Sequence, residues 1–463
     1  MLESDRQASE LADIQGRLVL LKVGILLLIA LLGLRLWQLQ IRDGHDYQEM
    51  AKENRTRSIM LEPARGLLYD RHGQLLANNI PSFNLYVSLE DVKDREALVG
   101  ELTRLLAFSQ KDLLEKLSGQ SRKARVKIKG GLSLKEAAIV ESHRYTLPGV
   151  FIQPEYQRHY PLGVYASHLI GYVGEISEAK LKEEEYQGLH QGSVVGQYGV
   201  ERTYDQALRG VSGQELLEVD AHGHRKQSIA VRKPSAGDDL YLTIDIRLQQ
   251  MAEDLLGEEA GAVVALDPRS GAVLILASRP TFDPTALSGG LPMSEWQALL
   301  NDPRHPLTNR TIQGQYPPGS TFKIVMAAAV LGSQTAQAAD HFFCPGGFKF
   351  GRRTYRDWKR GGHGSVELIA ALAQSCDVYF YKVGNRMGIE TIASYSKQFG
   401  LGQKTGIDLP SERSGLVPSG AWKKRVKGEP WYPGETISVS IGQGFMNVTP
   451  IQMAQVVAAT AMN

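Results

Sequence analysis

The chain has 463 residues, of which 22% are charged and 43% are hydrophobic, and its formal net charge is +2. This composition excludes a disordered polymer. The net charge argues neither for nor against nucleic acid or anionic lipid, and we expect no nucleic-acid partner. The length allows about three domains of ~150 residues, and two cysteines exclude a disulfide framework.

An apolar segment lies near the N-terminus, at residues 18–37 (LVLLKVGILLLIALLGLRLW). Its two charged residues, Lys22 and Arg35, lie near its ends. As a helix, 20 residues would span about 30 Å, the thickness of a membrane's hydrocarbon core. No small-residue cleavage site follows, so the segment predicts an uncleaved signal anchor rather than a removed signal peptide. The alternative is a buried helix of a soluble protein.

The orientation of this anchor is predicted from size rather than charge. Lysines and arginines are more numerous after the apolar segment than before it, which does not favour a cytoplasmic N-terminus. Long domains, however, are translocated largely regardless of flanking charge. We therefore expect residues 1–17 in the cytoplasm, a single pass through the inner membrane, and the bulk of the chain in the periplasm.

Residues 38–235 have the composition of a non-catalytic pedestal domain. Apolar stretches on both sides of residues 70–73 (Asp-Arg-His-Gly) predict a hairpin, and residues 95–145 look largely helical. Residues 150–235 are rich in glycine, with short strand-like runs. We find no paired carboxylates and no His/Cys cluster in this sequence that would indicate catalysis.

The sequence pattern changes near residue 235, where we place a domain boundary. Residues 240–256 predict a strand entering a helix, and residues 261–278 predict a hairpin of two apolar strands. Beyond the hairpin, residues 279–463 look mostly helical. Residues 236–463 therefore predict a second domain in which helices and a small sheet combine.

A serine three residues before a lysine puts both side chains on one helical face, where the lysine can activate the hydroxyl. The spacing alone is weak, because it occurs at Ser177–Lys180, Ser320–Lys323 and Ser394–Lys397. Only Ser320 follows a Pro-Pro-Gly stop and precedes an apolar, alanine-rich run. A helix N-terminus favours developing negative charge, so we predict Ser320 as the nucleophile and Lys323 as its base.

A second short motif is Ser375-Cys376-Asp377. In a loop opposite the first pair, the hydroxyl of Ser375 can relay a proton, and the carboxylate of Asp377 can face Lys323 or the substrate. The tripeptide is common, so its role depends on the other motifs.

Together with stretches spread over the whole chain, these motifs resemble the class B penicillin-binding proteins of the elongation type (penicillin-binding protein 2). The matching stretches are Arg65-Gly66 with Asp70-Arg71-x-Gly73, Tyr160-Pro161-x-Gly163 with His168-x-x-Gly171, Gly199-x-Glu201 with Leu208-x-Gly210, Asp267-Pro268, Pro317-Pro318-Gly319-Ser320-x-x-Lys323, Tyr355-Arg356-Asp357-Trp358, and Ser440-Ile441-Gly442-Gln443-Gly444. The resemblance implies an α+β fold with a transmembrane helix, an extended pedestal and a domain like that of the serine transpeptidases and β-lactamases.

The resemblance also implies an activity, that of a serine-type D-Ala–D-Ala transpeptidase of peptidoglycan biosynthesis and cell shape. Ser320 would attack the stem peptide, Lys323 would be the base, and Ser375 and Asp377 would move and orient protons. The N–H of Ser320 would supply half of an oxyanion hole, and β-lactams would acylate the same serine. The implied partners are stem peptides, elongation-machinery proteins and a polytopic glycosyltransferase.

The third motif of this family, Lys-Thr-Gly, lies on a strand beside the cleft, and the chain contains Lys404-Thr405-Gly406. The residues before Lys404 form a turn-like run with two glycines, and Pro410 follows, which disfavours a core strand. We therefore interpret Lys404 as a coincidence. We expect that the chain is truncated before the true motif, that its transpeptidase domain is incomplete, and that this fragment alone is inactive.

The two cysteines suggest a metal site. Cys344 and Cys376 flank Asp357 and His363, and these four residue types are competent ligands of a closed structural Zn²⁺ site. A Cys344–Cys376 disulfide in an oxidising periplasm is a second interpretation, and two unrelated thiols are a third.

A different class of function is a membrane-anchored non-catalytic scaffold or β-lactam sensor. The large pedestal and the missing third motif favour it. A sensor needs a cytoplasmic signalling domain, which residues 1–17 are too few to supply.

Overall fold

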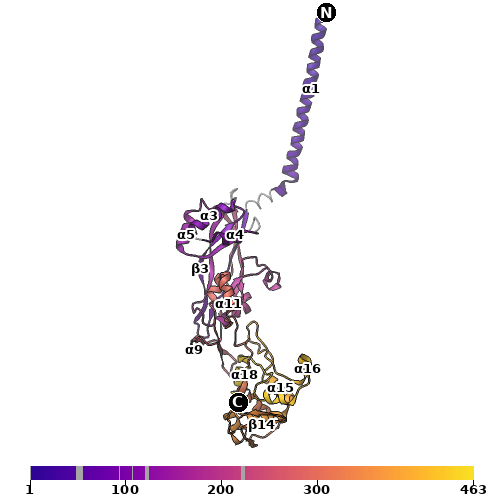
Figure 1. The fold of residues 1–463 in the computed structure, drawn as a ribbon. Helices are drawn as coiled ribbons and strands as arrows, with labels where there is room; N and C mark the ends of the chain where they lie inside the picture. Colours follow the sequence, from indigo (N-terminus) through magenta and orange to yellow (C-terminus); the bar gives the residue numbers. More distant parts are fainter. Residues whose placement is uncertain are drawn as a thin grey trace. The chain divides into compact units, whose positions relative to one another are not determined.

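The computed structural model divides into two compact units (Figure 1). Unit 1 comprises residues 1–63 and 211–235, and unit 2 comprises residues 64–210 and 236–463. The structure describes residues 2–47, 56–92, 94–106, 108–119, 125–219 and 225–462.

Unit 1 contains one long helix and a small sheet. Helix α1 (Leu2–Trp37), the long indigo helix of Figure 1, continues into a π-helical turn, η1 (Gln38–Arg42). Within them, Leu21–Arg42 is long and apolar enough to cross a membrane, five residues further along the chain than the predicted end at Trp37. The sheet is antiparallel in the order β1-β8-β9, with strands β1 (Thr56–Leu61), β8 (Gly213–Val219) and β9 (Arg225–Arg232).

The first half of unit 2 is built on a five-stranded sheet in the order β10-β2-β3-β4, with β5 also pairing with β3. The strands are β2 (Leu68–Tyr69), β3 (Leu75–Ser88), β4 (Arg125–Leu132), β5 (Val150–His159) and β10 (Leu240–Tyr241). The hairpin predicted around residues 70–73 is confirmed, since β2 and β3 pair antiparallel and Gly73 N donates to Asp70 O across the turn (3.1 Å).

Three helices pack on one end of this sheet and enclose a core of their own. They are α3 (Arg95–Leu106), α4 (Gln110–Leu117) and α5 (Leu134–Ser142), and Figure 1 shows them gathered around one end of β3. The expectation that residues 95–145 are largely helical is wrong for β4. Its alternating apolar side chains pair with β3, and this tertiary contact overrides the local helical pattern.

The rest of the pedestal region is held by a buried network of ion pairs. Arg65 Nε lies 2.6 Å from Glu201 Oε2, and Arg158 Nε lies 2.7 Å from Glu201 Oε1. Although burial opposes ionisation, these two guanidinium groups hold the pKa of Glu201 below its ordinary value. The elements of this region are α6 (Ser167–Ile170), β6 (Val173–Glu175), η2 (Lys180–Lys182), η3 (Glu184–Tyr186), β7 (Val194–Gly196), α7 (Gly199–Thr203) and α8 (Asp205–Arg209).

The second half of unit 2 begins as the sequence predicts and is then mostly helical. Strand β10 leads to α9 (Ile246–Leu256), and the predicted hairpin is formed by β11 (Gly261–Leu266) and β12 (Val273–Arg279). The later helices are α10 (Pro284–Gly289), α11 (Met293–Asn301), η4 (Gly319–Phe322), α12 (Lys323–Gly332), α13 (Leu368–Ala373), α14 (Asp377–Met387), α15 (Ile389–Gln398), α16 (Gly420–Lys427), α17 (Pro433–Val439) and α18 (Pro450–Thr460). Two short antiparallel pairs interrupt them, β13 (Phe342–Cys344) with β16 (Gly364–Val366), and β14 (Gly347–Phe350) with β15 (Arg353–Arg356).

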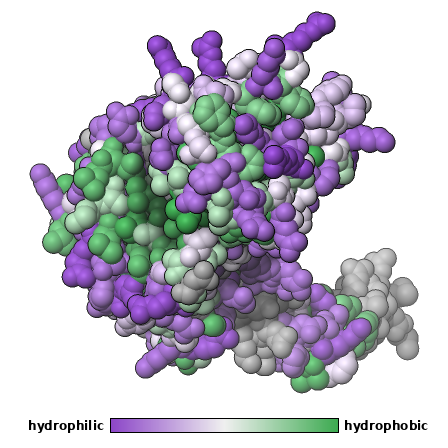
Figure 2. All heavy atoms as spheres, turned by 90° about the horizontal axis from the view of Figure 1, so that it is seen from below, coloured by the Kyte–Doolittle hydropathy of each residue, from purple (hydrophilic) through white to green (hydrophobic). Residues whose placement is uncertain are grey.

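The core that positions the site lies between α12 and α14, which pack against each other. Gly384 of α14 lets Ser440, which follows α17, approach α14 closely, because a Cβ at Gly384 would lie 2.4 Å from the Cβ of Ser440. Figure 2 shows a face of the molecule where hydrophobic side chains gather around a hollow. The α+β class predicted from the sequence is confirmed.

His168 of α6 is a buried, neutral histidine. Its Nε2 donates a hydrogen bond to the carbonyl oxygen of Pro306 (2.7 Å), and burial lowers the pKa of its imidazole to about 4. Since an unfolded histidine has a pKa of about 6.5, the unfolded chain takes up a proton at this position before the folded chain does.

Lowering the pH from 7 to 5 is therefore expected to reduce the free energy of unfolding by about 2 kcal/mol through His168 alone. In His168→Gln this part of the pH dependence is expected to disappear, whereas His341→Gln, at an exposed histidine, keeps it. Thermal unfolding of the detergent-solubilised proteins at the two pH values, followed by tryptophan fluorescence, measures the difference. If the stability of the parent and of His168→Gln changed equally with pH, His168 would not be the source of this pH dependence.

Candidate active site

The residues around Ser320 form a tight 3₁₀ turn, η4, that runs directly into α12 at Lys323. In a 3₁₀ turn, residues three apart lie over one another, so Ser320 and Lys323 share one face. Gly319 starts the turn with a positive φ of 56°, and its N–H donates to Gly442 O (3.0 Å). A Cβ at Gly442 would lie 2.4 Å from Gly319 O, so glycine is required for this approach.

A chain of hydrogen bonds joins the four residues that the sequence predicts as catalytic. Lys323 Nζ donates to Asp377 Oδ1 (2.6 Å), to Ser375 O (2.9 Å) and to Ser375 Oγ (3.0 Å). Ser375 Oγ in turn donates to Ser320 Oγ (2.9 Å). Lys323 is therefore connected to Ser320, the predicted nucleophile, through the hydroxyl of Ser375.

The Lys323 side chain is 1% exposed, so its ammonium group depends on these partners. The carboxylate of Asp377, 14% exposed, offsets its charge, and the face of the Phe380 ring lies 5.6 Å away. Helix α14 begins at Asp377, which fixes this carboxylate beside the lysine.

Ser375 adopts a conformation that non-glycine residues rarely occupy, with φ at +52°. Such a conformation costs about 1–3 kcal/mol and persists only where surrounding contacts hold it. It turns both the carbonyl and the hydroxyl of Ser375 toward Lys323.

The two other Ser-x-x-Lys pairs lie in different surroundings. Ser177 is exposed, and Lys180 Nζ donates to Gln197 Oε1 (2.6 Å). Ser394 and Lys397 are both exposed on α15. In the described part of the chain no hydrogen bond joins either serine to a second serine hydroxyl, which agrees with the choice of Ser320 from its sequence context.

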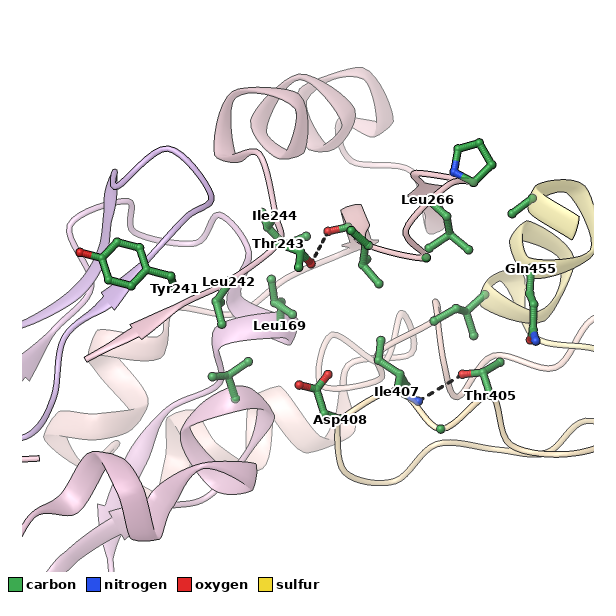
Figure 3. A pocket seen from close by; sticks show the side chains of 18 of the residues that line it. Leu169, Tyr241, Leu242, Thr243, Ile244, Leu266, Thr405, Ile407, Asp408 and Gln455 are labelled. Atoms are coloured by element: carbon green, nitrogen blue, oxygen red, sulfur yellow. Dashed lines mark hydrogen bonds between the residues drawn. The ribbon is translucent and has the colours of Figure 1, made fainter. Parts of the chain in front are cut away.

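Lys404-Thr405-Gly406 lies in a loop and not on a strand. The N–H and the hydroxyl of Thr405 both donate to Glu412 Oε1 (2.7 Å each), and Lys404 is exposed. Thr405 and Gly406 instead line a cavity of about 650 Å³ (Figure 3). Its lining contains none of the four predicted catalytic residues.

The four predicted metal ligands, Cys344, Asp357, His363 and Cys376, also lie together. One ligand atom from each lies within 4.8 Å of the other three. Asp357 Oδ2 lies 3.4 Å from Cys344 Sγ and 3.5 Å from Cys376 Sγ. His363 Nδ1 lies 3.7 Å from Cys344 Sγ and 3.4 Å from Asp357 Oδ1.

The electrostatics of this cluster differ from group to group. Burial raises the pKa of the Cys376 thiol. Burial also opposes ionisation of Asp357, but the N–H groups of Lys359 and Val378 hold the pKa of its carboxyl below the ordinary value. Both cysteines are buried free thiols in the structure.

Sequence reasoning assigned no role to Trp358, although this residue contacts residues 374–377, the segment that contains Ser375 and Asp377. Its indole Nε1–H lies 3.2 Å from both Gln374 O and Ser375 O, and its backbone N–H donates to Asp377 Oδ2 (3.3 Å). The Tyr355-Arg356-Asp357-Trp358 stretch was part of the family resemblance, and it was the one signal in the sequence that pointed to this residue.

Comparison with known proteins agrees with this geometry. Residues 60–242 match the penicillin-binding protein dimerisation domain, and residues 261–463 match the penicillin-binding protein transpeptidase domain. The peptidoglycan D,D-transpeptidase MrdA of Acinetobacter baumannii is 38% identical over 98% of this chain and 70% of its own length. MrdA of Escherichia coli K12 is 37% identical over 94% of this chain and 70% of its own length.

A solved structure is also similar. Penicillin-binding protein 2 of Helicobacter pylori, in its complex with MreC, superposes with a TM-score of 0.81 and 31% identity, over 88% of this chain and 77% of that one. The expected family is thereby confirmed: this chain belongs to the class B penicillin-binding protein 2 (MrdA) family, with a dimerisation domain followed by a transpeptidase domain.

Proposed function

We propose that this protein is a peptidoglycan D,D-transpeptidase that crosslinks stem peptides through a serine acyl-enzyme during cell elongation. The observation that carries the proposal is the hydrogen-bonded chain from Lys323 through Ser375 to Ser320. Such a chain gives a serine hydroxyl a route for its proton, which serine needs before it becomes a useful nucleophile. The relatives named MrdA support the same activity.

In acylation, Ser320 Oγ attacks the carbonyl carbon between the two D-alanines. For this step Lys323 first releases one proton of its ammonium group to solvent; the proton of Ser320 then passes to Ser375 Oγ while the proton of Ser375 passes to Lys323 Nζ. Asp377 stabilises the ammonium that results. As the C–N bond breaks, the same path returns the proton to the departing D-Ala amine and leaves an ester on Ser320.

In the second half-reaction, the amine of a neighbouring stem peptide attacks this ester. Its proton follows the same relay, the C–O bond to Ser320 breaks, and the serine regains its hydrogen. A β-lactam acylates Ser320 by the first half-reaction, and its opened ring stays attached as a penicilloyl ester.

We also propose where the protein works. Leu21–Arg42 would be the single-pass anchor in the inner membrane, with the bulk of the chain in the periplasm beside its substrate. The Helicobacter pylori relative was solved in complex with MreC, which supports partners in the elongation machinery. A polytopic glycosyltransferase that makes the glycan strands would be one of them.

The third family motif is proposed to come from a strand other than Lys404-Thr405-Gly406, because that tripeptide lies in a loop held by Glu412.

A fluorescent penicillin tests the nucleophile. The product of the complete gene, in detergent, is expected to be labelled covalently at Ser320, and Ser320→Ala is expected to abolish labelling. Ser177→Ala and Ser394→Ala, at the two other Ser-x-x-Lys pairs, should keep it. If Ser320→Ala supported normal crosslinking and cell shape, the non-catalytic scaffold would replace the enzyme.

Lys323→Met removes the base and keeps the length of the side chain. The acylation rate is expected to fall by about 10²–10⁴, the usual contribution of general base catalysis. The rate is measured from the time course of penicillin labelling, with Lys397→Met on the exposed face of α15 as the control. Parental rates in Lys323→Met would remove this lysine from the mechanism.

We propose further that Cys344, Asp357, His363 and Cys376 hold a structural Zn²⁺ ion. Tetrahedral zinc with these ligands places neighbouring ligand atoms about 3.3–3.8 Å apart. Four contacts within the cluster, from 3.4 to 3.7 Å, support this spacing, and the ligand atoms of all four residues lie within 4.8 Å of one another. With four protein ligands the site would be closed, so the ion would support folding rather than chemistry.

Metal content per purified chain tests this site. We expect about one zinc per chain in the parent and a large loss in Cys376→Ser and His363→Ala. His341→Ala, at an exposed histidine, should retain the metal. Absence of zinc together with absence of free thiol would support the disulfide interpretation, and absence of zinc with two free thiols would leave a cluster of unrelated side chains.

A further inference from the structure

Trp358 is exposed over 65% of its surface, yet both of its polar hydrogens point back into the protein. Its backbone N–H donates to Asp377, and its indole N–H is shared between the carbonyls of Gln374 and Ser375, at 3.2 Å from each. An indole this exposed can donate its hydrogen to water. Here it donates to the loop that carries the proton relay.

The carbonyl oxygen of Ser375 accepts from two sides of the site. Lys323 Nζ donates to it from α12 (2.9 Å), and Trp358 Nε1 donates to it from the loop after β15. Ser375 itself is in a left-handed conformation, which persists only where surrounding contacts hold it. That conformation is what places Ser375 Oγ between Lys323 and Ser320.

The residue before Trp358 holds the next part of the same loop. Asp357 Oδ2 accepts from Val378 N (3.1 Å), in the first turn of α14. Asp357 is itself fixed by Gly346, whose carbonyl accepts its N–H (3.1 Å), and by the Cys/His cluster. Residues 357 and 358 therefore form hydrogen bonds with four residues of the segment 374–378.

We propose that Trp358 is a positioning residue for the acylation of Ser320. Its indole N–H holds the Ser375 carbonyl so that the Ser375 hydroxyl bridges Lys323 and Ser320. In this role Trp358 affects the chemical step and not the affinity for the substrate. The inference rests on the transpeptidase function proposed above.

Two variants at this position separate the hydrogen bond from the ring. Trp358→Phe keeps an aromatic ring and loses the donor. Replacement of Trp358 by benzothienylalanine keeps the size and shape of the indole, with sulfur in place of N–H. Trp296→Phe, on α11, is the matched control, because no hydrogen bond or ring contact joins this tryptophan to residues 374–378 in the described part of the chain.

Penicillin acylation of the complete gene product is resolved into the dissociation constant of the first complex and the rate constant of acylation. Both Trp358 variants are expected to lower the rate constant about tenfold, as loss of one hydrogen bond allows, with an unchanged dissociation constant. Zinc content and melting temperature should stay at parental values.

Amide hydrogen exchange, measured without substrate, gives an independent readout. In both variants the peptide spanning residues 374–378 is expected to exchange faster, and in Trp296→Phe it should not. Unchanged exchange there, an unchanged acylation rate, or a weakened first complex with a normal rate constant would each overturn the role of Trp358. A parent protein that is not acylated at all would refute the transpeptidase function instead, and hydrogen exchange would still decide whether Trp358 holds the loop.

Discussion

The site depends on one buried charge, the ammonium group of Lys323. A lysine that is 1% exposed loses its hydration, and the cost is tolerable only if protein groups replace the water. Asp377 supplies the opposite charge, and Ser375 supplies two acceptors. Because these acceptors must converge on one nitrogen, they dictate the backbone conformation of Ser375. The position of the Ser375 hydroxyl thus follows from the need to provide the buried Lys323 with hydrogen-bond acceptors in place of water.

This requirement has to be met by segments that are far apart in the sequence. Lys323 begins α12, Asp377 begins α14, and the turn that carries Ser320 is held by the carbonyl of Gly442. The packing of α12 against α14 brings the first two together, and the absence of a side chain at Gly442 lets the third approach. The apolar core between these elements therefore sets the geometry of the reaction.

The sequence predicted the parts of this site that depend on local order. The spacing of Ser320 and Lys323, the hairpin at residues 261–278 and the ligand types at Cys344 and Cys376 can all be seen in short windows. The left-handed Ser375 could not be predicted, because tertiary contacts decide it, whereas β4 was missed although residues 125–129 alternate polar and apolar side chains. The same limit hid Trp358, because the two carbonyl oxygens that accept its indole N–H lie 16 and 17 residues further along the chain.

The Cys/Asp/His cluster and the hydrogen-bond chain from Lys323 to Ser320 use neighbouring residues of the same backbone segments. This arrangement gives the long glycine-rich loop a reason to fold back over the site. In two consecutive pairs, one residue faces the cluster and its neighbour faces the relay: Asp357 with Trp358, and Cys376 with Asp377. A shift of either cluster residue would therefore displace its neighbour by a similar amount. Since proton transfer depends on hydrogen bonds of about 2.6–3.2 Å, a small displacement is enough to break the relay. A cluster at this place therefore bears on the position of Ser375, which adjoins Cys376 and lies within hydrogen-bond distance of both Lys323 and Ser320.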